Sequence, residues 1–329
     1  MTDRHPATVG HAKPAPDACS VLWGRDGTSA YGTAARAGFF VVIEQPGPWG
    51  RRAAEESHLP RQVGQELDAR AASAGGRFML MRRPGPHVDR HGRHRVLVAY
   101  AGGAVADAWL LAGDLDRAED LLSLDWAGLA GGHVDAVAAS LPRAEPSPPV
   151  LLICTNGRRD VCCAVRGRPL ASAAADLEPE RVWEVSHTGG HRFAPTGVLL
   201  PWGEALARLD EGTVAQTLEA SLRGELPAGL LGPTHDRGRS ALPGDLQAAE
   251  SFVRHLVAET RLTSLTTETV PADTGTRPAD GSASHARVRH ADGREWLVRV
   301  TRRNTGLQRP ESCGKAAVDV HEYEVTLAG

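Results

Sequence analysis

Two cysteines and two histidines fall close together near the middle of this 329-residue chain. Cys154 and Cys163 lie in the run LLICTNGRRDVCC, and His187 and His191 enclose the segment HTGGH that follows. Thiolate sulfur favours zinc, copper(I) or an iron–sulfur cluster, and imidazole nitrogen suits zinc, copper and iron. These four side chains therefore predict a metal centre better than they predict a hydrolytic triad.

The elements expected around these residues bring them into one small domain. The run PVLLICT predicts a buried strand that carries Cys154, and residues 161–177 predict a helix. Asp160 is a suitable N-cap for that helix, so Cys162 and Cys163 would lie in its first turn, where the helix dipole favours a thiolate. The histidines follow the next expected strand, RVWEVSH, and the two glycines between them allow a tight turn that directs both imidazoles to one point.

The residues alone leave several alternatives open. Adjacent side chains leave a helix about 100° apart, so only one of Cys162 and Cys163 should bind the metal, and the bare sequence does not choose between them. A structural zinc site in a non-redox scaffold protein is the direct rival, although Cys154 and Cys163 are farther apart than the usual spacing of about two to four residues. A thiol oxidoreductase using Cys162 or Cys163 is a third reading. The last is a Gly-rich turn with two surface histidines beside two buried cysteines.

The other two cysteines, Cys19 and Cys313, are isolated in the sequence. Lone cysteines are commonly buried as small hydrophobes, so we expect each to pack separately, with a reactive thiol at Cys313 as the weaker alternative. Five cysteines at irregular spacing do not predict a disulfide framework.

Turn-rich stretches suggest how the chain is divided. We expect a disordered tail over residues 1–16, an N-terminal α/β domain over 17–145, a thioredoxin-like domain over 146–235 and a C-terminal α+β segment over 236–329. The two middle regions share the order β-α-β-β-β-α, with the first unit ending in a helix over 116–122. The predicted fold class is therefore α/β (α+β), with two tandem thioredoxin-like units, the first degenerate, and a small α+β appendage.

Composition excludes several classes of function. A net charge of −3 and a pI near 6.5 give no sign of nucleic-acid binding. The sequence has no apolar run long enough for a signal peptide or a membrane span, so we expect a cytoplasmic protein. Neither G-x-G-x-x-G nor a Walker sequence is present, so no nucleotide cofactor is predicted.

Four segments resemble the sucrase/ferredoxin-like family, whose members include the yeast actin-patch-distal protein. These segments are CTNGRRDVCCAVRG, HTGGHRFAPTGVLLPWG, the early CS…GTA…EQPGPWG and the late RPESCG. The resemblance runs from about Asp17 to the end and implies a thioredoxin-like ferredoxin domain with a [2Fe–2S] cluster held by two cysteines and two histidines. On this chain it places the ligands at Cys154, Cys163, His187 and His191, with Cys162 where other members often hold a non-cysteine.

The resemblance implies an electron-transfer protein that works with a redox partner protein of unknown identity. The two cysteines would hold one iron and the two histidines the outer iron, which takes up the electron. If one imidazole nitrogen stays in solvent, reduction should couple to proton uptake, because added negative charge favours the protonated ring. The word "sucrase" in the family name implies glycoside hydrolysis, which needs two carboxyl groups flanking the scissile bond. No pattern in the sequence singles out such a pair, so that activity is not predicted.

Overall fold

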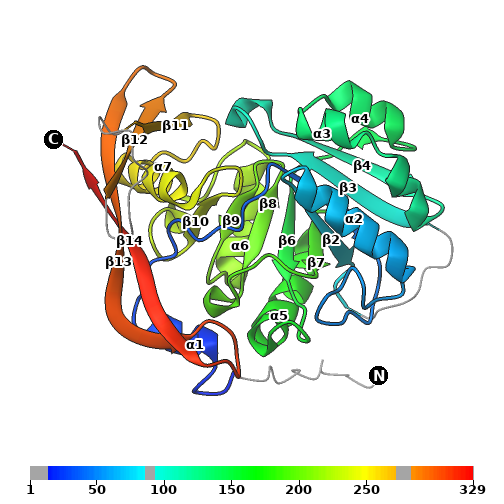
Figure 1. Ribbon diagram of the computed structural model, residues 1–329, viewed down its shortest axis with the longest axis horizontal. Helices are drawn as coiled ribbons and strands as arrows, with labels where there is room; N and C mark the ends of the chain where they lie inside the picture. The colour runs from blue at the N-terminus through cyan, green and yellow to red at the C-terminus, as the bar shows by residue number, and fades with distance from the viewer. Residues whose placement is uncertain (1–13, 86–92, 272–282, 329) are drawn as a thin grey trace, which may run out of the picture.

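The computed structural model describes residues 14–85, 93–271 and 283–328. A ten-stranded mixed sheet lies at its centre, and a separate four-stranded sheet lies beside it (Figure 1). The predicted α/β (α+β) fold class is therefore confirmed. Residues 1–13 of the predicted tail lie outside the described residues.

Two copies of one strand and helix pattern form most of the large sheet. In each copy the first two strands are parallel and joined by a helix, and the third strand lies antiparallel to the first. The first copy comprises β1 (Phe39–Glu44), α2 (Arg61–Ser73), β2 (Arg77–Arg82), β3 (His94–Tyr100) and β4 (Trp109–Leu115). The second comprises β6 (Val150–Cys154), α5 (Val161–Leu177), β7 (Val182–Val185), β8 (Gly197–Leu200), β9 (Glu204–Leu206) and the closing helix α6 (Glu211–Ser221).

The first copy closes differently from the expectation. The helix predicted over 116–122 is a 3-10 segment, Ala118–Ser123, followed by two short helices, α3 (Trp126–Ala130) and α4 (Val134–Ser140). A 3-10 segment is common in short pieces and connectors, where the chain does not continue into further helical turns.

The two copies share one continuous sheet. Its strand order is β10-β9-β8-β6-β7-β2-β1-β3-β4-β5, with β5 (Glu145–Pro146) and β10 (Asp236–Arg239) at the edges. In the middle, β2 and β7 pair in antiparallel fashion through Met81 and Val185. This pairing removes the free edge that each unit would otherwise expose. The predicted domain limits stay predictions.

Alternate residues of each strand bury against different layers, as the period of two requires. In β1, Phe39, Val41 and Ile43 pack in one core with residues of α2, α3 and α4. Phe40 and Val42 face the opposite core, which both copies share through β2, β6 and β7. Helices α5 and α6 pack on a third core against β6, β8 and β9. In Figure 1, α2, α5 and α6 lie in front of the sheet.

The C-terminal region forms the second sheet and an arm. Helix α7 (Gly244–Leu256) packs on β11 (Leu265–Val270), β12 (Ala283–His290), β13 (Glu295–Pro310) and β14 (Ala317–Leu327). The strand expected near 295–302 continues to Pro310, so β13 and β14 extend beyond the sheet and return to α1 (Cys19–Arg25) (Figure 1). There the Trp23 indole donates to the carbonyl of Pro310 at 3.0 Å.

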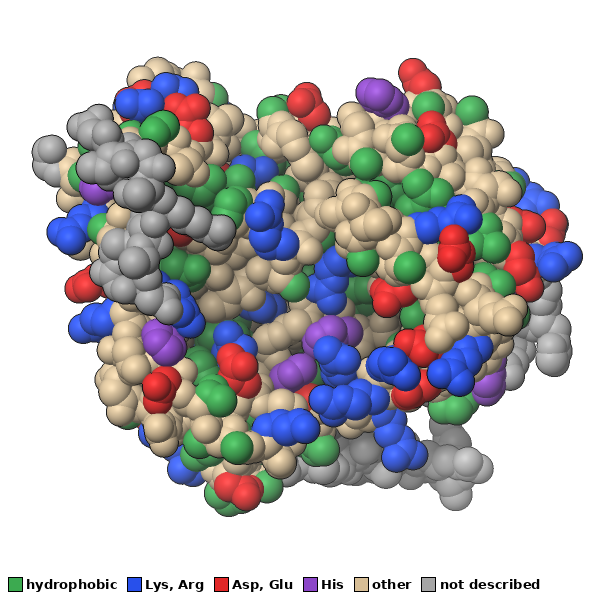
Figure 2. Space-filling view, in the orientation of Figure 1, with side chains coloured by type: hydrophobic (Ala, Val, Ile, Leu, Met, Phe, Trp, Pro, Cys, Tyr) green, Lys and Arg blue, Asp and Glu red, His purple; other side chains and the backbone are tan. Residues whose placement is uncertain are grey.

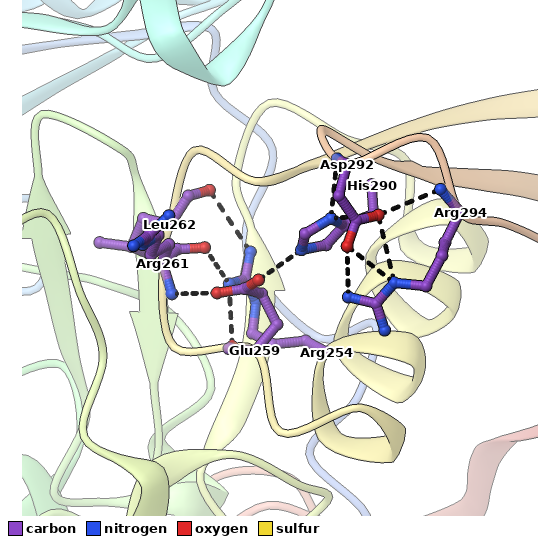
Figure 3. Close-up of polar contacts among 7 residues, drawn as sticks. All are labelled: Arg254, Glu259, Arg261, Leu262, His290, Asp292 and Arg294. Atoms are coloured by element: carbon purple, nitrogen blue, oxygen red, sulfur yellow. Dashed lines mark hydrogen bonds and ion pairs between the residues drawn. The ribbon is translucent and has the colours of Figure 1, made fainter.

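A polar network ties the end of α7 to the turn between β12 and β13. Its members, drawn in Figure 3, are Arg254, Glu259, Arg261, Leu262, His290, Asp292 and Arg294. The buried Arg254 guanidinium donates to the carbonyl of Arg261 at 2.8 Å, and the two nitrogens of His290 contact Glu259 and Asp292. Arg254 thus satisfies a backbone carbonyl beyond the helix, and His290 joins the Glu259 carboxylate to the turn that carries Asp292.

Among the described helices, none combines the length and the apolar character needed to cross a bilayer.

Candidate metal centres

The turn between β6 and α5 positions the two cysteines that the sequence predicts as ligands. Cys154 ends the buried strand β6, and Asp160 caps α5 by accepting a hydrogen bond from the Cys162 N–H at 2.9 Å. The predicted helix limits and N-cap are both found. The adjacent residues Cys162 and Cys163 then point different ways, because successive side chains on a helix diverge by about 100°.

Cys163 points toward Cys154, and Cys162 points away from it. A hydrogen bond from the Cys163 thiol lowers the pKa of Cys154 well below its ordinary value, opposed by burial, and His187 and the Thr188 N–H add to the lowering. The same contact raises the pKa of Cys163. Both sulfurs are buried, and a metal that binds both would displace the proton of the Cys163 thiol.

The histidines meet beside these thiols. The rings of His187 and His191 are stacked, with their centroids 5.5 Å apart. The Nδ1 atom of each ring is buried and has no hydrogen-bond partner among the described residues. Burial lowers the pKa of His191 and so favours the neutral ring, the form in which histidine binds a metal. Because buried polar atoms are normally partnered, two orphaned nitrogens beside a thiol pair fit metal ligation.

Two arginines fix the backbone of the HTGGH turn. Arg77 donates to the carbonyls of His187 and Thr188 at 2.9 and 3.1 Å, and Arg237 donates to the carbonyl of Gly189 at 3.1 Å. Burial lowers the pKa of Arg237 to about 9, so it remains charged at neutral pH. Both guanidinium groups interact electrostatically with the Cys154 sulfur and favour its thiolate form.

The predicted set of four is too widely spread for a single ion. Ligand atoms around one tetrahedral zinc, with bonds of about 2.0–2.3 Å, lie roughly 3.3–3.8 Å from one another. Among the described residues, three or more metal-ligating atoms do lie within 4.8 Å of one another, but in a group that contains none of these four residues. The donor types and the orphaned nitrogens still fit metal ligation.

That different group consists of Cys19, Asp160, Cys162 and Cys313. The Cys162 sulfur lies 3.5 Å from that of Cys19 and 3.2 Å from that of Cys313, and the last two are 3.6 Å apart. The Asp160 oxygens lie 3.8 and 3.9 Å from the Cys19 sulfur. This group can hold a metal ion. The sequence did not predict this group, because Cys19 and Cys313 were expected to pack as isolated thiols. The only signal for them was their occurrence in the family-like segments CS and RPESCG.

Comparison with known proteins identifies the family. The model of the sucrase/ferredoxin-like family matches residues 30–228, which include both copies of the repeated pattern, Cys154, Cys163 and the HTGGH segment. The chain belongs to this family. No curated protein and no solved structure matches it. Cys19 and Cys313 lie outside the matched residues.

Proposed function

We propose that this chain is an electron carrier that binds a [2Fe–2S] cluster through Cys154, Cys163, His187 and His191. The observation that carries the proposal is the pair of buried, unpartnered Nδ1 atoms beside a pair of buried thiols. Such a cluster supplies one-electron redox chemistry, with a potential on the order of −150 to +300 mV for two-histidine ligation.

The four side chains divide the site into an inner and an outer half. Cys154 and Cys163 are each 1% exposed, whereas His187 and His191 are only partly buried. The cysteines therefore hold the group in the protein interior and exclude water from that side. The histidines form the side nearest the surface, where electrons would enter and leave.

The surface around the site is suited to an acidic redox partner. Arg36, Arg51 and Arg158 are exposed, and the ion pairs found in the described part of the chain include none of them. In Figure 2, histidine side chains lie in a hollow beside a dense group of basic side chains. Complementary charge accelerates encounter between partners, so the proposed partner is a redox protein with a negative surface.

The two rival functions have weaker support. A thiol oxidoreductase needs an accessible thiolate, and Cys154, Cys162 and Cys163 are all 1% exposed. A zinc site built from the same four residues needs ligand atoms closer together than these are.

The test is metal and sulfide analysis of protein purified without oxygen. The wild type should contain about two irons and two acid-labile sulfides per chain, absorb visible light and give an electron paramagnetic resonance signal after reduction. Cys154→Ser, Cys163→Ser and His187→Ala should abolish or alter that signal. Cys162→Ser is the matched control and should retain iron, because its sulfur points away from Cys154. A colourless wild type, or iron lost in Cys162→Ser and kept in Cys163→Ser, contradicts the proposal.

A further inference from the structure

Three thiols and one carboxylate meet outside the proposed cluster ligands, and they come from three distant parts of the chain. Cys19 begins α1, Asp160 and Cys162 lie at the start of α5, and Cys313 lies in the turn between β13 and β14. Cys162 is 143 residues from Cys19 and 151 from Cys313 along the chain. Three of these residues are buried and Cys313 is partly buried.

We propose that Cys19, Cys162, Cys313 and Asp160 form a structural zinc site. The site fastens the N-terminal helix and the tip of the β13–β14 arm to the start of α5. It is separate from the proposed cluster and does not depend on it.

The distances match a single tetrahedral ion. The separations between sulfurs, and between the Cys19 sulfur and the carboxylate, run from 3.2 to 3.9 Å. A zinc ion with bonds of about 2.3 Å to sulfur and 2.0–2.2 Å to oxygen requires separations of roughly 3.5–3.8 Å. Shifts of a few tenths of an ångström would therefore complete the coordination.

The carboxylate has a free position for the ion. Asp160 Oδ2 accepts hydrogen bonds from the Ser312 hydroxyl and the Cys313 N–H, both at 2.8 Å, whereas Oδ1 accepts one from the Cys162 N–H. Two carboxylate oxygens offer about four acceptor positions, so one remains on Oδ1. The three hydrogen bonds orient the carboxylate, as the outer contacts of metal ligands usually do.

Neither a disulfide nor simple apolar packing explains why all four side chains meet. A disulfide would use two of the three sulfurs and leave the third thiol and the carboxylate unexplained. Apolar packing of three thiols gains nothing from a carboxylate in contact with them. Zinc uses all four, and soft thiolates with one carboxylate suit it. Arg166, which donates to Ser20 Oγ at 3.2 Å, places positive charge near this anionic set.

The proposed consequence is that zinc holds the arm in place. Besides the four ligands and the hydrogen bonds of Trp23 and Ser312, two ion pairs hold the tip of the arm: Arg309 with Asp26 at 2.7 Å and Arg192 with Glu311 at 3.0 Å. Both ion pairs are partly exposed and worth little individually. Zinc that binds only the folded arrangement adds its binding free energy to the stability of the docked arm.

The test counts zinc and iron separately in the full-length chain. Protein produced in zinc-supplemented medium and purified anaerobically with a reductant should contain about one zinc per chain. Cys19→Ser and Cys313→Ser should each lose at least about nine-tenths of that zinc, unfold at lower temperature and keep their iron. Cys154→Ser is the reciprocal control and should lose iron but keep zinc.

A second measurement needs no variant. X-ray absorption at the zinc edge of the wild type should show three sulfurs at about 2.3 Å and one oxygen at about 2.0–2.2 Å. Zinc below about one-tenth per chain after incubation with added zinc, or zinc retained in both serine variants, would each overturn the proposal. Zinc lost only in Cys154→Ser would also overturn it. If iron is absent everywhere but zinc follows Cys19 and Cys313, this site stands and the proposed electron carrier fails.

Discussion

Two glutamates at the junction between the sheets, Glu204 and Glu250, are buried to similar degrees but have opposite protonation preferences. Burial raises the pKa of Glu204 well above its ordinary value, and the neighbouring Asp236 raises it further. Burial also raises the pKa of Glu250, but Arg239, bonded to both of its oxygens at 2.7 and 3.0 Å, more than offsets this and lowers it. The surroundings of Glu204 therefore favour its neutral form, and those of Glu250 favour its charged form.

This difference predicts unequal effects of the same substitution. Glu250→Gln should reduce the free energy of unfolding by about 3–5 kcal/mol, because it leaves the buried Arg239 charge without its partner. Glu204→Gln should cost less than about 1 kcal/mol, since an amide replaces an already neutral group that can donate a hydrogen bond. Urea unfolding of both variants measures this. Equal losses would show that Glu204 is charged in the folded protein.

The same two residues predict opposite dependences on pH. The folded pKa of Glu250 is depressed, so its stabilisation is present above the unfolded pKa of about 4.3 and is lost as the pH falls through the folded value. The folded pKa of Glu204 is raised, so its contribution is present below about pH 4.3 and is lost as the pH rises toward the folded value. Relative to the wild type, Glu204→Gln should therefore gain stability with rising pH, and the deficit of Glu250→Gln should shrink in acid. Unfolding free energies at several pH values test both signs, and parallel curves would contradict them.

At the scale of single elements, the glycines of the HTGGH turn differ in what surrounds them. Gly189 and Gly190 have φ values of 84° and 70°, which an L side chain adopts with difficulty. A Cβ on Gly189 would meet the Ala35 methyl at an ordinary 3.5 Å, but one on Gly190 would lie 2.5 Å from the fully buried Arg237 guanidinium.

Gly190→Ala should therefore perturb the proposed cluster more than Gly189→Ala does. Both substitutions should lower the free energy of unfolding by about 1–2 kcal/mol through backbone strain. Only Gly190→Ala also displaces Arg237, which holds the turn. Iron content and the reduced-state resonance spectrum compare the two. Similar iron loss in both variants would mean that backbone strain alone decides the outcome.

Local patterns predicted individual elements well. The helix over 161–177 and its Asp160 cap are found at the predicted residues, because the cap, the apolar spacing and the dipole all act within one or two turns. The repeated strand order was also predictable, since alternating apolar runs and short turns specify it.

Long-range pairing was not predictable from one sequence. Nothing near Cys19 or Cys313 indicates that they meet Cys162, since that contact depends on how β13 and β14 curve back to α1. The extension of β13 to Pro310 was not predicted for the same reason. The polar residues beyond 302 form a strand only because their backbone pairs with β14. The capped first turn of α5 gives the adjacent residues Cys162 and Cys163 different directions. Cys163 points toward Cys154, and Cys162 points toward Cys313.

At the scale of the whole molecule, charge is unevenly distributed: the net charge is −3, but exposed arginines lie around the proposed cluster. Arg158 is exposed in the turn between Cys154 and Cys163, and Arg36 and Arg51 are exposed on neighbouring loops. A local field of this kind raises the concentration of anions near the site, although the chain as a whole repels them.

This field predicts how fast a small anionic reductant reacts. Arg158→Glu should slow reduction of the cluster by dithionite several-fold at low ionic strength, and the difference should fade in about 1 M salt, where the screening length falls to about 3 Å. Arg299→Glu, the same charge change at an exposed position on β13 in the other sheet, is the matched control and should have little effect. Stopped-flow bleaching of the visible absorption measures both rates. If the two variants slow equally, net charge rather than the arginines around the site governs the encounter.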